Sequence, residues 1–273
     1  MDASLYTILA LKLSLVPGLT LVASFVGIRW GPAASGWLIS LPLTSGPVLF
    51  FLAIEQGDTF ASTASEGVIL GLASIIAFAL AYTWLALRHQ TKPWFYPMLL
   101  GWGAFFLTTF LLDGIFTSEV IAFVGVVAFL LLAIRALPKL SAVPTSQPVD
   151  TKEIVARAVA ATALVLFITE ASATLGPYLS GLLTPFPIYV SVLAASTHRI
   201  QGPASAVQLV RGTILGLFTP AVFCLIIGTT IVGLGVGVSF ALAAVASLPI
   251  HGIILRFLKQ GARPNGYVTL QAT

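Results

Sequence analysis

Long runs of apolar residues, each about as long as a transmembrane helix, follow one another along almost the whole chain. A helix that crosses the hydrocarbon core of a bilayer needs about 20 mostly apolar residues, whereas barrel strands are short and alternate. The pattern therefore predicts an all-α polytopic membrane protein. We expect nine spans, at residues 5–27, 33–54, 60–87, 94–112, 117–137, 153–174, 178–197, 205–231 and 235–257.

One polar, proline-bearing segment, SAVPTSQPVDTKE at residues 141–153, interrupts the pattern near its middle. It predicts three parts. Residues 1–140 form a first membrane unit of five spans, residues 141–152 form a linker, and residues 153–273 form a second unit of four spans with a polar tail. The first residues, MDASLYT, lack a basic stretch, so no cleavable signal peptide is expected.

Composition supports the membrane assignment, because 58% of the residues are hydrophobic and only 8% are charged, against roughly 25% charged in soluble domains. The net charge of +4 does not come from a basic cluster on a polar face, so nucleic acid is not an expected partner. The one cysteine, Cys224, lies in an apolar run and can form no intramolecular disulfide.

The charges orient the nine predicted spans. The basic residues of short loops lie on the cytoplasmic side of membrane proteins. With the N-terminus outside and the C-terminus in the cytoplasm, all Lys and Arg residues but Lys12 lie on or near the inner side, and most acidic residues lie outside. The inner residues are Arg29, Arg88, Lys92, Arg135, Lys139, Lys152, Arg157, Arg199, Arg211, Arg256, Lys259 and Arg263.

The two units share a sequence pattern at a constant offset of 145 residues. The stretch GPAASGWLISLPLTSGP begins at Gly31 and GPYLSGLLTPFPIYV begins at Gly176; further along, GVILGL at 67–72 matches GTILGL at 212–217. Fourteen of the 42 positions from 31 to 72 are identical without a gap, including Gly, Pro and Gln, which shared apolar composition does not explain. We interpret this as an internal duplication. Since the first copy has five spans, the second enters from the opposite side, as in the inverted repeats of many secondary transporters.

The second and seventh predicted spans contain prolines at equivalent places, Pro42 and Pro187. Proline removes a backbone donor and breaks a helix, and freed carbonyls in a bilayer are tolerated against protein or a water-lined cavity. Broken segments at matching places in two halves indicate a binding site near the membrane midplane. The candidate site residues are Pro42, Thr44, Ser45, Thr184, Pro187, Tyr189 and Ser191. Close helix packing by small residues is the alternative reading.

Charged residues inside spans are costly and often functional. Lys12 and Glu66 could pair, Glu170 could take up a proton or hold Lys12, and Arg157 and Arg211 fall at the positions equivalent to Lys12 and Glu66. The arginines could attract an anion, although snorkelling to the headgroups explains them equally well. No metal-ligand set, phosphate loop or protease motif is present. We therefore expect no enzyme activity, catalytic residue, metal or cofactor.

The stretch SGWLISLPLTSGPVLFFLAIEQG at residues 35–57 resembles small bacterial inner-membrane proteins of the GlpM-like kind, which share a G-P…P-L-T-S-G-P run and an acidic-Gln-Gly end. The second copy, through THRIQG at 197–202, is similar in tandem, so the resemblance covers about a third of the chain. It implies a location in the bacterial inner membrane. For some members of this family a link to exopolysaccharide production has been suggested.

Together these observations favour a secondary transporter that moves a small polar or anionic solute across the bacterial inner membrane. The alternative is a non-transporting membrane protein that assists envelope or exopolysaccharide assembly. The bilayer is the expected partner in both cases, and the sequence leaves a homodimer open. A transporter needs a polar cavity where the second and seventh spans cross, whereas an accessory protein would fill that crossing with side chains.

Overall fold

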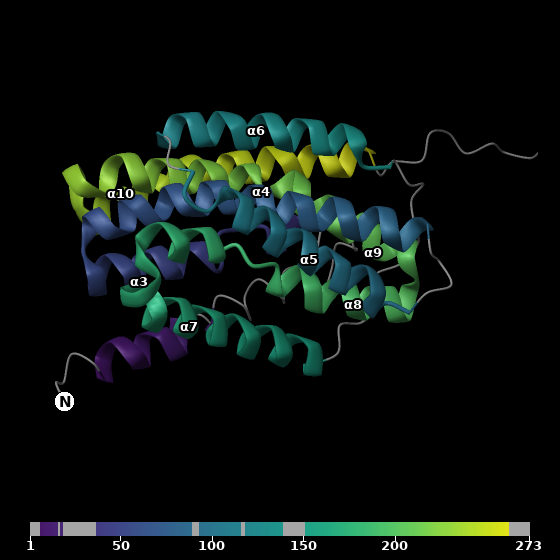
Figure 1. Ribbon diagram of the computed structural model, residues 1–273, viewed down its shortest axis with the longest axis horizontal. Coiled ribbons are helices and arrows are strands. Elements are labelled where there is room, and N and C mark those ends of the chain that lie inside the picture. The colour runs from purple at the N-terminus through teal and green to yellow at the C-terminus, as the bar shows by residue number, and fades with distance from the viewer. Residues whose placement is uncertain are drawn as a thin grey trace, which may run out of the picture.

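The computed structural model describes residues 6–15, 17–18, 37–88, 93–115, 118–138 and 151–261, and within these ranges the regular elements are all helices. A short helix, Tyr6–Leu15, comes first. The labelled helices are α3 (Ser45–Gln56), α4 (Asp58–Arg88), α5 (Phe95–Leu112), α6 (Glu119–Ala136), α7 (Thr151–Leu183), α8 (Ile188–Gln201), α9 (Pro203–Gly216) and α10 (Phe218–Gly261). Figure 1 shows them as one elongated bundle. The helical class predicted from the sequence is confirmed.

Five helical stretches in the described part of the chain are long and apolar enough to cross a membrane. They are Asp58–Arg88, Phe95–Leu112, Glu119–Ala136, Ile154–Leu183 and Pro203–Ile254, and Tyr6–Leu15 is apolar but shorter. This fits a helical protein with several membrane passes. The predicted spans 60–87, 94–112 and 117–137 coincide within a few residues with α4, α5 and α6.

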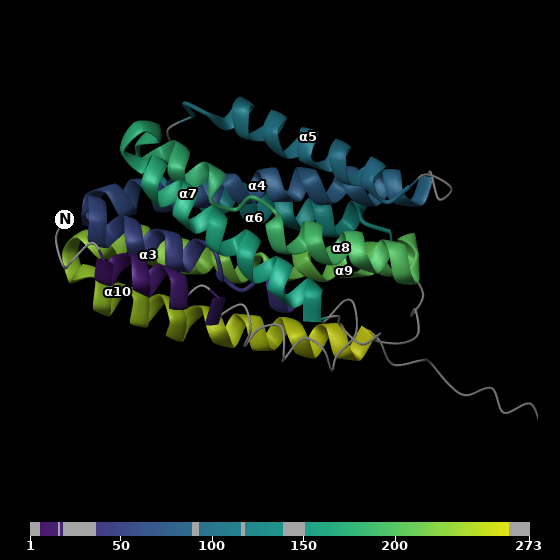
Figure 2. The same cartoon turned by 90° about the horizontal axis from the view of Figure 1, so that it is seen from below.

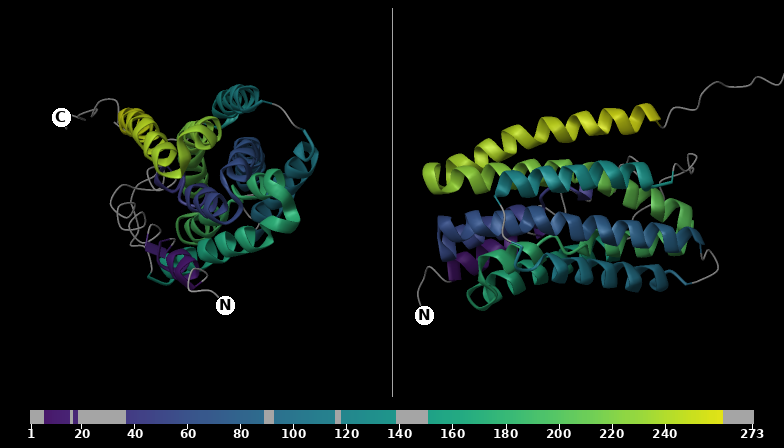
Figure 3. Two further views of the ribbon diagram at one scale, coloured as in Figure 1. Left: turned by 90° about the vertical axis from the view of Figure 1, so that its left-hand side faces the viewer. Right: turned by 45° about the horizontal axis from the view of Figure 1, so that its top comes forward.

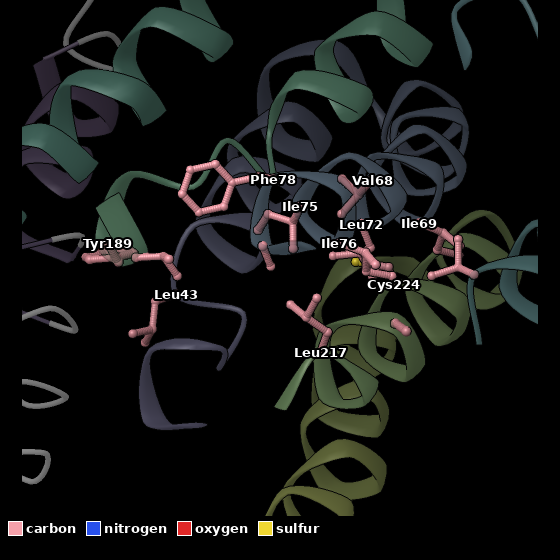
Figure 4. Close-up of a cluster of buried hydrophobic side chains, with 14 of the residues drawn as sticks. Leu43, Val68, Ile69, Leu72, Ile75, Ile76, Phe78, Tyr189, Leu217 and Cys224 are labelled. Atoms are coloured by element: carbon pink, nitrogen blue, oxygen red, sulfur yellow. The ribbon is translucent and has the colours of Figure 1, made fainter. Parts of the chain in front are cut away.

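Helix α4 is the centre of the bundle. It contacts α3, α5, α6, α7, α9 and α10, and side chains along most of its length are buried. In Figure 4 its residues Leu72, Ile75 and Ile76 lie close to Leu217, which follows α9, and to Cys224 of α10. The apolar packing that joins the two predicted units is therefore arranged around this helix.

The outer face is apolar. Large hydrophobic side chains stand exposed on α5, α6 and the second part of α10, and Phe110 (76% exposed) and Val245 (71%) are the most open of them. Soluble monomers rarely expose apolar patches larger than a few hundred Å². Hydroxyl side chains are buried instead, among them Ser65, Ser74 and Thr83 on α4. This distribution suits a surface in contact with lipid.

Five described glycines have φ values that side chains with a Cβ rarely adopt, and four of them reverse or bend the chain at helix junctions. Gly57 (φ 92°) joins α3 to α4, and Gly202 (φ 86°) joins α8 to α9. Gly176 turns the chain within α7, and Gly235 folds α10 back on itself, as Figure 3 shows for α10. A single helical stretch such as Pro203–Ile254 thus contains two oppositely directed helices.

Gly57 and Gly202 lie at opposite ends of the bundle. In Figures 1 and 2, α3 runs to the end nearest the N-terminus, whereas α8 runs to the other end. Helix α4 then runs back from the first end, and α9 with the first part of α10 runs back from the second. Figure 2 also places α5 and the last part of α10 on opposite sides of the bundle. Helices α3 and α8, whose residues are separated by 145 positions, therefore run in opposite directions (Figures 1 and 2).

Candidate functional site

Two helices are interrupted at equivalent places. Residues 37–39 are helical, residues 40–44 are not, and α3 begins at Ser45; likewise α7 ends at Leu183, residues 184–187 are not helical, and α8 begins at Ile188. Each interruption contains one of the two prolines that the sequence singled out, Pro42 and Pro187. Because proline cannot donate to the preceding turn, a helix broken at this place is the expected result.

The backbone hydrogen bonds of the two interruptions match at the offset of 145. In the first, the bonds are Leu41 N to Leu38 O (3.1 Å), Leu43 N to Leu41 O (2.6 Å) and Gly46 N to Pro42 O (2.9 Å). In the second, they are Phe186 N to Leu183 O (3.0 Å), Ile188 N to Phe186 O (2.7 Å) and Ser191 N to Pro187 O (2.8 Å). The two segments thus share a local conformation although their side chains differ.

Each interrupted segment packs against a glycine-containing helix of the other predicted unit. A Cβ on Gly71 of α4 would lie 2.5 Å from the carbonyl oxygen of Leu182 and 2.9 Å from Pro185. A Cβ on Gly216 of α9 would meet Ser40 and lie 3.0 Å from the carbonyl oxygen of Trp37. The two sets of contacts are equivalent, because Gly216, Leu182 and Pro185 lie 145 positions after Gly71, Trp37 and Ser40. Glycine at both places lets the backbones approach closely.

A cavity lies between the two interruptions. Its volume is about 50 Å³, enough to hold a few water molecules. It is lined by Ile39, Ser40, Leu41, Thr44, Ser45, Leu72, Ile75, Pro185, Phe186, Pro187, Ile188, Tyr189, Val190, Thr213, Leu217 and Pro220. Figure 4 shows Tyr189 of α8 close to Leu43 of the first interruption, at the side of the core away from Cys224.

Both predicted units contribute to the lining, with seven residues from the first and nine from the second. Twelve of its 16 residues form six pairs separated by 145 positions: Ser40 with Pro185, Leu41 with Phe186, Thr44 with Tyr189, Ser45 with Val190, Leu72 with Leu217, and Ile75 with Pro220. A cavity placed at random between helices would not select equivalent positions in this way. The cavity therefore lies where segments separated by 145 positions in the sequence meet.

The polar groups of the lining are hydroxyls. Ser40, Thr44, Ser45, Tyr189 and Thr213 supply them, and none of the described residues that line the cavity is charged. A hydroxyl group both donates and accepts hydrogen bonds. The site can therefore bind uncharged hydroxyl, amide or water groups, and it has no ion that would compensate a charged ligand.

Four of the seven site residues predicted from the sequence line the cavity, namely Thr44, Ser45, Pro187 and Tyr189. The other three contribute to the surrounding structure. The carbonyl of Pro42 accepts from Gly46 N at 2.9 Å. The Thr184 hydroxyl donates to Ser180 O at 2.7 Å, and the Ser191 hydroxyl accepts from Trp102 Nε1 at 2.9 Å.

Sequence reasoning missed Thr213, which joins the lining from α9. Its hydroxyl also donates to Leu209 O at 3.2 Å. It lies within GTILGL, one of the two matching motifs, but the equivalent residue in GVILGL is Val68. The sequence did contain a signal for Thr213. The two motifs differ at this one position, where a hydroxyl residue replaces valine in an otherwise identical apolar run.

The pairing of Lys12 with acidic residues differs in part from the one predicted from the sequence. Lys12 contacts Glu55 at 2.6 Å and Glu170 at 3.5 Å, so the expected contact with Glu170 is present and Glu55 takes the place expected for Glu66. Glu66 instead interacts electrostatically with Glu119 and Tyr178. Tyr178 also donates to the carbonyl of Leu112 at 3.0 Å.

Neither of the two arginines that were predicted to attract an anion is among the described residues that line the cavity. Arg211 donates to the carbonyl oxygen of Pro138 at 3.1 Å, which ties α9 to the end of α6. The side chain of Arg157 lies outside the part of the chain that the structure describes. Arg211 therefore has a structural contact of its own.

Two histidines form buried contacts away from the cavity lining. His198 Nδ1 and the Tyr82 hydroxyl lie 3.0 Å apart, and His251 Nδ1 and the Thr219 hydroxyl lie 2.8 Å apart. Among the described residues, no group of three or more His, Cys, Asp or Glu side chains is arranged to hold a metal ion.

Fold and site together define a class: a helical protein with long apolar helices, an apolar outer surface and a small polar cavity between two interrupted helices. Comparison with protein-family models, curated proteins and solved structures finds no match to the chain.

Proposed function

We propose that this protein is a small secondary transporter with nine membrane spans, arranged as an inverted repeat of five and four. It moves a small, neutral, polar solute through the cavity between residues 40–44 and 184–187 by alternating access. The resemblance to GlpM-like proteins supports the bacterial inner membrane as its location. The distribution of Lys and Arg supports an outer N-terminus and a cytoplasmic C-terminus.

The described helices support the nine-span count. Helices α4, α5 and α6 account for three spans, and α7 before Gly176 accounts for a fourth. The interrupted pairs, 37–39 with α3 and 177–183 with α8, account for two more. Helix α9 with the first part of α10, and the part of α10 after Gly235, account for another two. The Tyr6–Leu15 helix begins the first.

The inverted repeat is supported by direction and by reciprocal contacts. Helices α3 and α8 run to opposite ends of the bundle (Figure 1). Gly71 and Gly216 each pack against the interrupted segment of the other copy. Such a relation is expected from a pseudo-two-fold axis in the membrane plane, the arrangement found in many secondary transporters.

The observation that carries the proposal is the cavity and its six residue pairs. In alternating access, one repeat moves against the other around a fixed site. A site lined by residues of both repeats opens to either side when they exchange conformations. The uncharged lining favours a neutral solute over an anionic one, because an unpaired charge is costly inside a membrane.

The test is solute flux into liposomes that contain the full-length protein. Urea, glycerol and erythritol serve as neutral probes, and phosphate and lactate serve as anionic ones, with uptake followed by light scattering. We expect saturable uptake of a neutral probe, faster than in protein-free liposomes. Rates equal to those of protein-free liposomes for every neutral probe would overturn the proposal and favour an accessory role in envelope or exopolysaccharide assembly.

A further inference from the structure

The hydroxyl groups that line the cavity are not equally able to donate a hydrogen bond. The Ser40 hydroxyl donates to the backbone carbonyl of Trp37, and the Thr213 hydroxyl donates to the backbone carbonyl of Leu209 at 3.2 Å. A carbonyl oxygen can only accept, so the single proton of each hydroxyl is already used within its own segment of the chain. Ser40 and Thr213 therefore offer a ligand in the cavity only the lone pairs of their oxygens.

These two acceptor oxygens belong to one wall of the cavity. The Ser40 side chain occupies the space beside Gly216 of α9, where an added Cβ would meet its hydroxyl oxygen. Gly216 and Thr213 are three positions apart on the same helix, and side chains with this spacing lie on one face, about 5–6 Å apart. Both oxygens can therefore accept from a single small molecule.

The remaining hydroxyls of the lining do not supply an equal number of donors. Ser45 is hydrogen-bonded to the side chain of Cys224. Thr44 and Tyr189 each carry one proton, and each can also accept. The lining as a whole therefore accepts more hydrogen bonds from a ligand than it can donate.

A main-chain carbonyl adds to this excess of acceptors. Pro220 lines the cavity and has no N–H, so the carbonyl of Gly216 receives no helical hydrogen bond from the residue four positions later. Gly216 is also the residue beside which Ser40 lies. The acceptors are thus concentrated where the end of α9 meets the first interruption.

We propose that the solute bound in this cavity is a compact, neutral molecule rich in N–H donors, of the urea or primary amide class. Two oxygens without available protons require a ligand that donates at least twice, because a buried acceptor left unpaired costs free energy. The described lining carries no charged side chain, which disfavours ammonium and guanidinium ions in a membrane interior. The volume of about 50 Å³, room for a few water molecules, suits a ligand of about four non-hydrogen atoms.

A matched series of small molecules separates the number of donors from size and charge. Urea, acetamide and acetone are planar, have the same number of non-hydrogen atoms, and carry four, two and no N–H protons. Guanidinium has the same shape and more N–H protons, but it is a cation. That a urea or an amide is the transported solute rests on the proposed function, whereas its binding can be measured on the resting protein without any flux.

The test is saturation-transfer NMR on the purified full-length protein in detergent, with the methyl protons of acetamide as the reporter. We expect more transfer to acetamide than in protein-free micelles, and displacement of acetamide by urea at concentrations that do not unfold the protein. Acetone should receive no more transfer than in micelles, and guanidinium should not displace acetamide. The proposal is overturned by equal transfer to acetone and acetamide, by displacement with guanidinium but not urea, or by no transfer to acetamide above the micelle level.

Variants assign the binding to the two acceptor oxygens. Thr213→Val introduces the residue that the first copy has at the equivalent position, Val68, and should lower the transfer to acetamide several-fold, as should Ser40→Ala. Thr162→Val is the matched control, because the buried Thr162 hydroxyl donates to Ala158 O at 2.7 Å in the same way on α7, outside the cavity lining. Equal transfer in folded Thr213→Val and Thr162→Val proteins also overturns the proposal.

The same measurements keep the two proposals apart. Binding of acetamide and urea without flux of any neutral probe into liposomes contradicts the transport function alone. Saturable flux of glycerol without binding of acetamide or urea contradicts the donor-rich class of solute alone.

Discussion

The indole ring of Trp37 lies flat on the imidazole ring of His251, with the ring centroids 4.0 Å apart and the planes 15° from parallel. Trp37 Nε1 also donates to the backbone carbonyl of His251 at 3.0 Å. The two residues are 214 positions apart. Their contact fastens the helical turn before the first interruption to the last helix of the chain, so it stabilises one wall of the cavity from outside.

Trp37→Phe should keep the ring contact but lose the hydrogen bond, which costs on the order of 1 kcal/mol of folding stability. Trp37→Ala should lose both, at about 3–5 kcal/mol. Thermal unfolding in detergent measures the difference. Trp84→Ala is the control, since that side chain is 59% exposed and should change little. Equal effects of Trp37→Ala and Trp84→Ala would contradict the buried position of Trp37.

Gly71→Ala and Gly216→Ala should both destabilise the fold, because each added methyl group meets an interrupted segment of the other copy. Overpacking of this kind costs about 1–3 kcal/mol. Gly103→Ala, on α5 with no atom near the added Cβ, should be neutral or stabilising. Unfolding midpoints of the three variants check this. The close contact would be refuted by Gly71→Ala and Gly103→Ala proteins of equal stability.

Thr44→Val and Tyr189→Phe each remove one hydroxyl from the cavity lining at positions 145 apart. A hydrogen bond contributes on the order of 1 kcal/mol, so solute flux should fall several-fold in each variant while expression stays normal. Thr63→Val is the matched control, because its hydroxyl donates to Thr59 O on the same helix, outside the cavity. Full activity of well-folded Thr44→Val and Tyr189→Phe proteins would contradict the proposal that the cavity binds the solute.

Water should reach the cavity. Cys224 is the only cysteine and is buried, so Cys224→Ala provides a background without reactive thiols. In it, Thr44→Cys should react with a small water-soluble thiol reagent several-fold faster than Ser65→Cys, since Ser65 is fully buried between α4 and α10. Rates of labelling followed by mass spectrometry decide the question. Equal rates would show that the cavity is closed to water.

Membrane orientation can be tested with reporter fusions after Asp113 and at Thr273. The bias of Lys and Arg predicts an external readout after Asp113 and a cytoplasmic one at Thr273. A cytoplasmic signal after Asp113 would be incompatible with the nine-span arrangement. If one fusion gave both an external and a cytoplasmic signal, the protein would insert in both orientations, which the strong bias of basic residues argues against.

Much of the helical pattern could be predicted from the sequence, because spans such as 60–87 and 94–112 are long apolar runs with polar ends and need no tertiary information. The interruptions were also predictable, since Pro42 and Pro187 each remove a backbone donor and clash with the preceding turn inside an apolar run. Four cavity residues followed from their positions beside these prolines.

The partners of individual side chains could not be predicted in the same way. Lys12 pairs with Glu55 of α3 and not with Glu66 of α4 because the last turn of α3, and not α4, brings a carboxylate to the N-terminal helix. Thr184 and Ser191 stand beside Pro187 in sequence, yet their hydroxyls bond to Ser180 and Trp102. Helix rotation depends on packing across the whole bundle, which a local pattern does not contain.

The uncharged lining of the cavity has an electrical consequence. A membrane potential acts on moving charge, at about 2.3 kcal/mol per elementary charge per 100 mV, and the described lining carries none. A neutral solute would therefore cross at a rate that the potential does not alter directly. Any dependence on voltage would have to arise from charged groups outside the lining, and among the described residues Lys12 with Glu55 and Glu170 is one such group.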